Sequence, residues 1–223
     1  MQRIPEPDLM DEPEQVLAYA RADFSEPHTR FVELFAEKFG TGVSGTVLDL
    51  GCGPGDICRR FANAFPACHV HGIDGSAEML ALAETAADNA EPAHISYQLR
   101  YLPDPQLPQQ HYHAVISNSL LHHLREPSVL WDTIIQCARP GAAVFIMDLL
   151  RPDTRAEAEQ LVELYAADEP EILKKDFFNS LLAAYLPSEV EAQLHRLGLT
   201  LKIEVVSDRH FIAFGRLPAA VSR

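Results

Sequence analysis

Short apolar runs recur along the middle of the chain and are separated by stretches long enough for a helix. They are rich in Val, Ile, Leu or Phe, which is typical of parallel strands buried on both faces. The predicted strands are residues 46–50, 69–74, 94–99, 114–118 and 142–148. This alternation predicts an α/β sheet with helices on both faces.

Two of the intervening helices carry their own boundary signals. Ser76 is placed to cap a helix over the following residues, AEMLALAETAAD, because a serine oxygen accepts hydrogen bonds from the free N–H groups of a first turn. A second helix is predicted from Ser128 to Ala138, with Pro140 and Gly141 stopping it. Both helices connect consecutive predicted strands.

The carboxyl-terminal part departs from this alternation. Ser188 and Glu191 fit a capping box at the start of a helix that ends near Gly198. Two further apolar runs, 201–206 and 210–214, are separated by only three residues. A gap that short requires a hairpin, so the last strand is predicted to be antiparallel to its neighbour.

Two segments lie outside the strand and helix alternation and are predicted to act as lids. Residues 1–43 contain an amphipathic helix with Phe31, Leu34, Phe35 and Phe39 at helical spacing. We expect one domain, divided into an N-terminal helical cap at 1–43, a cofactor-binding half at 44–150, a helical insertion at 151–187, and a carboxyl-terminal helix and β-hairpin at 188–223.

Composition restricts the binding partners and the cellular location that we expect for this protein. The 223 residues include 32 Asp and Glu against 18 Lys and Arg, a formal charge of -14 that repels phosphate backbones. The polar amino terminus does not resemble a secretory signal, and no apolar run is long enough to span a bilayer. The four cysteines form no CxxC pair. We therefore expect a cytoplasmic monomer or homodimer without nucleic-acid or membrane partners.

The run TVLDLGCGPGD, residues 46–56, places three glycines directly after a predicted strand. Glycine has no Cβ, so this backbone can approach a ligand closely. The dinucleotide fingerprint needs GxGxxG, whereas the spacing here is GxGxG and Asp49 precedes it. A carboxylate at that position disfavours pyrophosphate and suits a cation. A second acid, Asp74, ends the next strand, where Rossmann-like sheets place an acid for ribose hydroxyls.

Four stretches occur in an order that resembles the class I S-adenosylmethionine-dependent methyltransferases. They are VLDLGCGPGD, HGIDGSAEML, AVISNSLLHHL and ARPGAAVFIMDLLRP, and they cover residues 46 to about 150. The resemblance implies a Rossmann-like, seven-stranded, mostly parallel sheet with an antiparallel strand in its carboxyl-terminal hairpin. It also implies S-adenosylmethionine as the cofactor, S-adenosylhomocysteine as the product and methylation of a small molecule.

The resemblance also implies a cofactor site. Asp49, Gly51 and Gly53 would surround the methionine moiety, Asp74 would hold the ribose, and Met79 would pack against the adenine. The family commonly has an acid after the third strand, but this chain reads LRYLPDPQLP there, so Tyr101 and Leu102 are expected to replace its contacts. The predicted cofactor residues are Asp49, Gly51, Cys52, Gly53, Asp74, Gly75, Met79, Tyr101, Leu102 and Asn118.

Candidate catalytic residues lie just past the fourth strand. His122 and His123 are expected on the carboxyl side of the sheet, and a histidine is suited to act as a base at neutral pH. Alternatively, they only hold the loop or the methionine moiety. Asp148 and Arg151, at the end of the fifth strand, either recognise the substrate or pair with each other.

An aromatic cover over the acceptor is predicted from both lid segments. Its candidate members are Tyr19, Phe24, His28 and Phe178, although aromatic residues at helical spacing often belong to the core. Two pairs of histidines occur one residue apart, His69 with His71 and His111 with His113. Neither pair is accompanied by a matching acid cluster, so no metal site is predicted.

The class of methyl acceptor is restricted mainly by motifs that the chain lacks. The chain has no [DNS]PP[YFW] segment after the fourth strand, which many DNA, RNA and protein amide methyltransferases of the family use. This absence and the acidic charge favour a small molecule, with oxygen, nitrogen, carbon, sulfur and arsenic acceptors all open. Alternatives are an enzyme that makes a modified S-adenosylmethionine and a non-catalytic module that binds S-adenosylmethionine to regulate a partner. A nicotinamide-dependent oxidoreductase is disfavoured by the glycine spacing.

Overall fold

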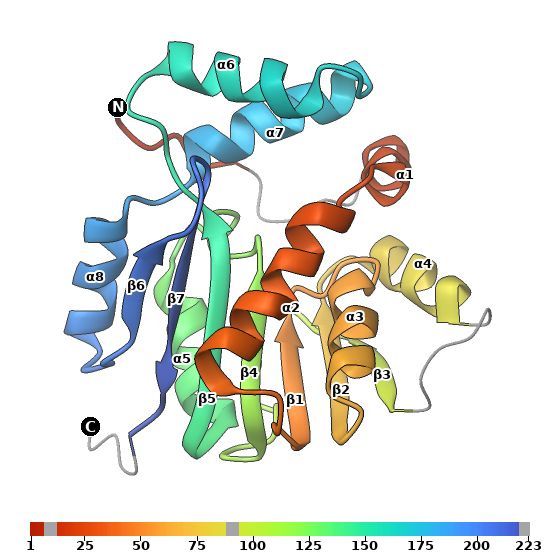
Figure 1. Cartoon of the computed structure of the whole chain (residues 1–223), viewed down its shortest axis with the longest axis vertical. Coiled ribbons are helices and arrows are strands. Elements are labelled where there is room, and N and C mark those ends of the chain that lie inside the picture. The colour runs from red at the N-terminus through yellow and green to blue at the C-terminus, as the bar shows by residue number, and fades with distance from the viewer. Residues whose placement is uncertain (7–12, 88–93, 219–223) are drawn as a thin grey trace.

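A single seven-stranded sheet forms the middle of the molecule (Figure 1). The computed structural model describes residues 1–6, 13–87 and 94–218. The strand order is β3-β2-β1-β4-β5-β7-β6, and β7 alone runs against its neighbours. The strands are β1 Gly45–Leu50, β2 Cys68–Asp74, β3 Ile95–Leu99, β4 Tyr112–Asn118, β5 Ala138–Leu149, β6 Lys202–Val205 and β7 His210–Arg216. The predicted Rossmann-like architecture is confirmed.

All five strands predicted from apolar runs are present, with ends close to the predicted ones except at the start of β5. That strand begins at Ala138 and therefore includes Pro140 and Gly141, which were expected to lie outside it. The hairpin prediction is also confirmed, because β6 and β7 pair in antiparallel register. The connection between them is too short to cross the sheet.

The described residues form eight helices, and the amino-terminal caps of α4 and α8 can be compared with the caps predicted from the sequence. The helices are α1 Pro13–Arg21, α2 Ser25–Phe39, α3 Asp56–Ala64, α4 Ala77–Ala87, α5 Ser128–Cys137, α6 Arg155–Ala166, α7 Glu171–Ala183 and α8 Pro187–Arg196. The Ser76 hydroxyl accepts from the Met79 N–H at 3.3 Å, as predicted. The capping box predicted at Ser188 is wrong, because Pro187 starts α8 earlier and Glu189 accepts from the Leu186 N–H at 2.9 Å.

Two apolar cores lie on opposite faces of the sheet. On one face, α2 and α3 bury Phe31, Phe35 and Phe61 against Val47 and Phe145. This confirms the predicted amphipathic helix. On the other face, α5 and α8 pack against the alternate strand residues, with Trp131 fully buried in that cluster. Consecutive residues of β1 thus face opposite layers.

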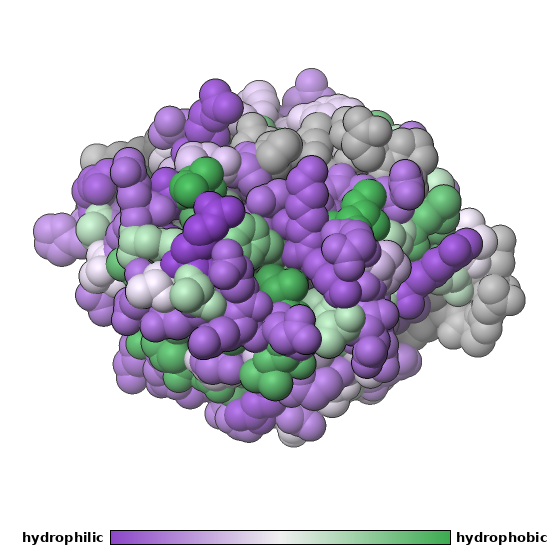
Figure 2. Space-filling model, turned by 90° about the horizontal axis from the view of Figure 1, so that it is seen from above, coloured by the Kyte–Doolittle hydropathy of each residue, from purple (hydrophilic) through white to green (hydrophobic). Residues whose placement is uncertain are grey.

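Helices α1, α6 and α7 lie above the carboxyl ends of the parallel strands, whereas α4 flanks β2 and β3 (Figure 1). Helices α6 and α7 pack against each other, and α1 packs against α7 and α4. Seen from this side, the surface is largely hydrophilic, with hydrophobic residues in small separate patches (Figure 2). No helix in the described ranges has the length and apolar character needed to cross a membrane. The cap and the insertion thus meet over the edge where open α/β sheets bind ligands.

Candidate active site

The largest concentration of predicted site residues lies in one cavity of about 490 Å³ at the carboxyl ends of β1, β2 and β4. We call it the glycine-loop cavity. Its wall includes the predicted residues Gly51, Gly53, Asp74, Gly75, Met79, Tyr101, Leu102 and Asn118. Parallel strands end at the same edge, which is why residues far apart in sequence converge here.

The loop after β1 exposes bare backbone to this cavity. Gly51, Gly53 and Gly55 all have positive φ, at 72°, 52° and 78°, a conformation that glycine adopts without steric cost. A Cβ built on Gly53 would meet no atom within 4 Å, so it would project into open space. A Cβ on Gly51 would instead lie 3.0 Å from the Leu120 side chain. Gly53 thus leaves room that a ligand can fill.

Asp74 fixes the opposite side of the same loop. Its Oδ2 accepts from the Gly53 N–H and its Oδ1 from the Ser76 N–H, both at 2.8 Å. Burial raises the pKa of Asp74, while these backbone donors act to lower it. Each carboxylate oxygen has a second lone pair. The side chain therefore can accept further hydroxyl donors from the cavity.

Two predicted cofactor residues, Asp49 and Cys52, lie behind the loop and do not line the cavity. Asp49 is 1% exposed and accepts a hydrogen bond from the Cys58 thiol at 3.1 Å. Burial raises the pKa of Asp49 to about 7. The reason is the strand alternation: Asp49 faces the α3 side of β1, whereas the glycines that follow turn towards the cavity.

A second cavity, of about 290 Å³, lies between the cap, the insertion and the sheet edge. We call it the aromatic cavity. The predicted residues Tyr19, Phe24 and His28 line it. The His28 ring is held by Asp56 at 2.7 Å, and the hydrogen bonds from His28 and Arg60 outweigh burial and lower the pKa of Asp56 to about 2. The predicted aromatic cover is thus partly assembled as a cavity wall.

Three residues predicted to contact the substrate, Phe178, Asp148 and Arg151, do not line the aromatic cavity. Phe178 packs into the cluster between α6 and α7, with the Arg155 guanidinium 4.8 Å from its ring centre, and Phe177 lines the cavity instead.

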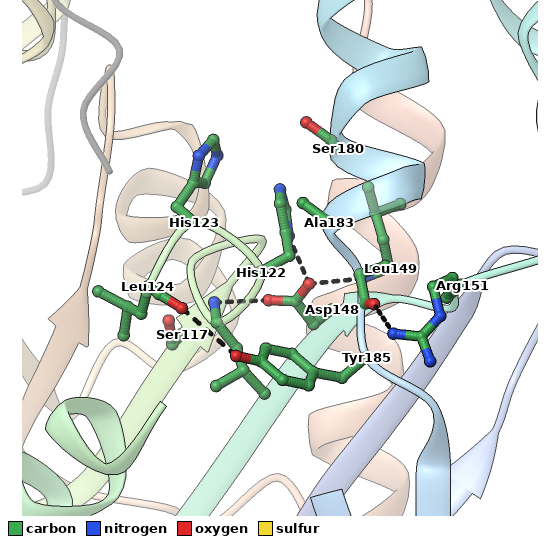
Figure 3. A network of polar contacts seen from close by, with 12 residues as sticks. Ser117, His122, His123, Leu124, Asp148, Leu149, Arg151, Ser180, Ala183 and Tyr185 are labelled. Atoms are coloured by element: carbon green, nitrogen blue, oxygen red, sulfur yellow. Dashed lines mark hydrogen bonds and ion pairs between the residues drawn. The ribbon is translucent and has the colours of Figure 1, made fainter. Parts of the chain in front are cut away.

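The predicted pair between Asp148 and Arg151 is wrong. Arg151 donates to the Ala184 carbonyl at 3.1 Å and pairs with Glu189 at 2.7 Å, so its guanidinium points away from Asp148 (Figure 3).

Several cavity residues were not predicted from the sequence. They are Tyr165, Glu169, Asp176, Ser180, Arg209 and His210. The hairpin could have indicated the last two, because antiparallel pairing places His210 opposite Leu149 at the carboxyl edge. Burial and the charge of Arg209 lower the pKa of His210 to about 4. The others come from the insertion, whose docking position has no local sequence signal.

The two cavities meet beyond the end of β4. Tyr19, Asn118 and Ser119 line both of them. Ser119 has φ 57°, which is uncommon for a residue with a side chain. Burial and the charges of Asp74 and Asp56 raise the pKa of Tyr19 to about 12, so its hydroxyl keeps its proton. A ligand in either cavity would therefore lie against the same three residues.

Asp148 orients a buried histidine at this junction. Its Oδ1 lies 2.5 Å from His122 Nδ1, and its Oδ2 accepts from the Leu121 N–H at 2.7 Å (Figure 3). Burial alone lowers the pKa of His122, but the Asp148 carboxylate outweighs it and raises that pKa. His122 lines the aromatic cavity and His123 lines the glycine-loop cavity. The predicted histidines are thus close neighbours that face different cavities.

The first six residues form a strap over these histidines. Arg3 donates to the His122 carbonyl at 2.8 Å and the Ile4 N–H donates to the Leu182 carbonyl at 2.9 Å. Glu6 accepts from the Ser180 hydroxyl at 3.1 Å, and its Oε1 lies 3.5 Å from His122 Nε2. The strap therefore joins the turn after β4 to α7, a contact that the sequence pattern did not predict.

Comparison with known proteins agrees with this geometry. A family model described as a methyltransferase domain matches residues 47–141, the region that builds the glycine-loop cavity. The match supports the class I S-adenosylmethionine-dependent methyltransferase family for this chain. This confirms the resemblance seen in the four motifs and the expected use of S-adenosylmethionine by the family. Both the loop glycines and Asp74 lie in the matched region.

The proteins to which this chain is similar have different named activities. A ubiquinone biosynthesis O-methyltransferase of Hydrogenovibrio crunogenus is 27% identical over 169 residues, which cover 75% of this chain and 67% of the relative. A phosphoethanolamine N-methyltransferase of Caenorhabditis elegans is 31% identical over 49% of this chain and 25% of its own length. A trans-aconitate 2-methyltransferase of Variovorax paradoxus is 28% identical, covering 66% of this chain and 54% of that protein.

Solved structures share the methyltransferase fold over nearly the whole chain. A S-adenosylmethionine-dependent methyltransferase from Aquifex aeolicus has a TM-score of 0.72 at 18% identity, covering 93% of this chain and 100% of that one. A plantazolicin methyltransferase in complex with S-adenosylhomocysteine and a desmethyl analogue has a TM-score of 0.69 at 14% identity, covering 92% and 90%. At 18% and 14% identity, the similarity to these structures shows that the fold is shared.

Proposed function

We propose that this methyltransferase moves a methyl group from S-adenosylmethionine to a hydroxyl or amine of a small molecule held in the aromatic cavity. The observation that carries the proposal is the meeting of two cavities at Tyr19, Asn118 and Ser119. Methyl transfer needs the nucleophile, the methyl carbon and the sulfur in line, and such alignment can contribute up to ~7–11 kcal/mol. Two adjacent cavities that share these wall residues suit that requirement.

The glycine-loop cavity fits the donor. Its volume of about 490 Å³ lies within the usual range for ligand pockets. We assign the backbone around Gly51 and Gly53 to the methionine moiety, Asp74 to the ribose and Met79 to the adenine. When bound, S-adenosylmethionine supplies a methyl group made electrophilic by its sulfonium. Tyr101, Leu102 and Asn118 complete this predicted set, while Asp49 and Cys52 support the loop from behind.

The aromatic cavity fits an acceptor that donates hydrogen bonds. Asp176 Oδ2 is buried and has no hydrogen-bond partner in the part of the chain that the structure describes, and burial raises the pKa of Asp176. A buried acceptor atom without a partner is costly, so a donor on the ligand would be favoured there. Arg209 is already engaged, 3.7 Å from Glu26 and 3.4 Å over the Tyr165 ring. The cavity therefore suits a hydroxyl or amine better than a polyanion.

The cap and the insertion complete the proposed enzyme by covering the junction. Phe24 and Phe177 come from these two segments and line the same cavity, which excludes water from an acceptor bound between them. The lid role predicted for both segments thus remains part of the proposal. The four cysteines are free and buried, which supports the predicted cytoplasmic location.

One labelling experiment tests the proposal. The full-length protein is incubated with methyl-labelled S-adenosylmethionine and a metabolite extract, and the labelled compound is identified by mass spectrometry. We expect a labelled small molecule in which oxygen or nitrogen carries the methyl group. Binding of S-adenosylhomocysteine without any labelled product would instead favour a regulatory module. A modified nucleoside as product would favour an enzyme that alters the cofactor.

A further inference from the structure

We propose that Glu6, His122 and His123 bind a divalent transition-metal ion, such as Zn²⁺, where the strap meets the turn after β4. One donor atom from each of these residues lies within 4.8 Å of the other two, and this is the group of three potential ligands found among the described residues. The predicted absence of a metal site rested on the histidine pairs at 69 with 71 and 111 with 113, neither of which belongs to such a group. Glu6 could not be linked to the histidines by spacing.

Two of the three separations between donor atoms match a coordination shell, and the third is within 4.8 Å. Glu6 Oε1 lies 3.5 Å from His122 Nε2 and 3.3 Å from His123 Nδ1. Ligands about 2.0–2.2 Å from a tetrahedral zinc ion lie roughly 3.3–3.5 Å from each other. An N–H···O hydrogen bond is usually shorter, about 2.9 Å. A single ion between the three atoms accounts for both separations.

Neighbouring side chains hold two of the proposed ligands in place. His122 Nδ1 lies 2.5 Å from Asp148 Oδ1, so its Nε2 is directed towards Glu6. A carboxylate behind a metal-bound histidine fixes the ring and increases its basicity, and this arrangement is common at metal sites. Ser180 donates to Glu6 Oε1 at 3.1 Å. Two imidazole nitrogens and a carboxylate oxygen form a donor set that zinc and similar metals prefer.

The position of the three ligands suggests how the metal is used. His122 lines the aromatic cavity and His123 lines the glycine-loop cavity, so the ion would lie beside their junction. Three protein ligands leave a coordination position open, as in catalytic rather than structural zinc sites. This step rests on the proposed function: an acceptor oxygen in the aromatic cavity would occupy the open position. Metal binding itself does not depend on it.

Metal binding is tested directly on the full-length protein. Metal-free protein is titrated with Co²⁺, whose d–d absorption reports the ligand set, and Zn²⁺ is then used to displace it. We expect one ion per chain and a spectrum of four- or five-coordinate Co²⁺ with nitrogen and oxygen ligands. Glu6→Gln keeps an oxygen that can accept from Ser180 but loses the charge, and His123→Gln removes one imidazole. Each is expected to weaken binding by at least about 10-fold.

The control is His69→Gln, which removes an exposed histidine on β2 outside the proposed site. It is expected to bind Co²⁺ like the natural protein. Circular dichroism and calorimetric binding of S-adenosylhomocysteine check that each variant is folded. Absence of a Co²⁺ site in the natural protein, or equal affinity in all variants, overturns the metal proposal. Label transfer without a metal site would overturn this proposal alone, and a metal site without label transfer would overturn only the proposed reaction.

Discussion

The two cavities are built in different ways, although they share a wall. The glycine-loop cavity is lined mainly by segments that follow strands of the parallel sheet, all within the stretch that matches the methyltransferase family model or beside it. The aromatic cavity takes its wall from α1, α2, α6, α7 and the start of β7. The sheet topology therefore fixes the first cavity, whereas the second depends on how added helices dock. We expect donor binding and acceptor binding to respond to different substitutions.

The largest expected effect concerns the acid behind the glycine loop. Asp49 has a pKa of about 7 in the folded protein against 3.8 when unperturbed, because it is buried. Folding therefore takes up a proton between these values, so this contribution to stability is complete below pH 3.8 and is lost as the pH rises through 7. Between pH 5 and 8 we expect the free energy of unfolding to fall by about 3 kcal/mol from this group.

The variant Asp49→Asn isolates this contribution. Asparagine keeps an oxygen that can accept from Cys58 but does not ionise. Between pH 5 and pH 8, the change in the free energy of unfolding, measured with urea, should be more positive by about 3 kcal/mol in the variant than in the natural protein. His210, whose pKa is lowered to about 4, adds the same rise with pH to both proteins and so does not affect this difference. Parallel stability curves for the two proteins would show that Asp49 is not the titrating group. Asp23, which is exposed at the rim of the aromatic cavity, provides the control as Asp23→Asn.

Asp74 provides the next test, because it belongs to the glycine-loop cavity alone. Asp74→Ala removes the carboxylate proposed to hold the ribose, and a lost hydrogen bond to a charged group costs about 1.5–3 kcal/mol. We expect the Kd for S-adenosylhomocysteine, measured by calorimetry, to rise about 10- to 100-fold. Asp176→Asn, in the aromatic cavity, should leave that Kd unchanged. An equal loss in both variants would mean that the cavities do not bind separate ligands.

The sequence predicted the glycine-loop cavity better than the aromatic cavity, because the sheet topology fixes the first and the docking of helices fixes the second. Gly53 and Asp74 could be placed because glycines and acids at strand ends have fixed positions in a parallel sheet. Asp176 and Glu6 could not be placed, because their positions depend on contacts between segments far apart in the chain. Arg151 was misplaced for a related reason: its partner Glu189 lies on α8, whose position against β5 no local pattern shows.

A matched pair of phenylalanines tests the wall of the aromatic cavity. Both Phe177 and Phe178 pack against the cluster between α6 and α7, but only Phe177 also lines the cavity. Phe177→Leu should raise the acceptor KM about 10-fold, equivalent to about 1.4 kcal/mol, because part of the apolar contact with the acceptor is lost. Both variants should lower the melting temperature, because both rings pack against the α6–α7 cluster, but Phe178→Leu should leave KM near its original value. Steady-state kinetics with the acceptor identified by labelling, together with thermal unfolding, would distinguish the two outcomes.

The smallest expected effect lies at the wall that the cavities share. Ser119 and Gln110 are the two described residues other than glycine with positive φ, at 57° and 48°. Glycine relieves the strain at either position, so each Gly variant should gain at most about 1 kcal/mol in urea unfolding. Ser119 lines both cavities and Gln110 lines neither. Only Ser119→Gly should therefore lower kcat, by a few-fold, because a freer backbone aligns donor and acceptor less well. If Gln110→Gly lowered kcat by a similar factor, the loss would come from backbone flexibility in general and not from the wall between the cavities.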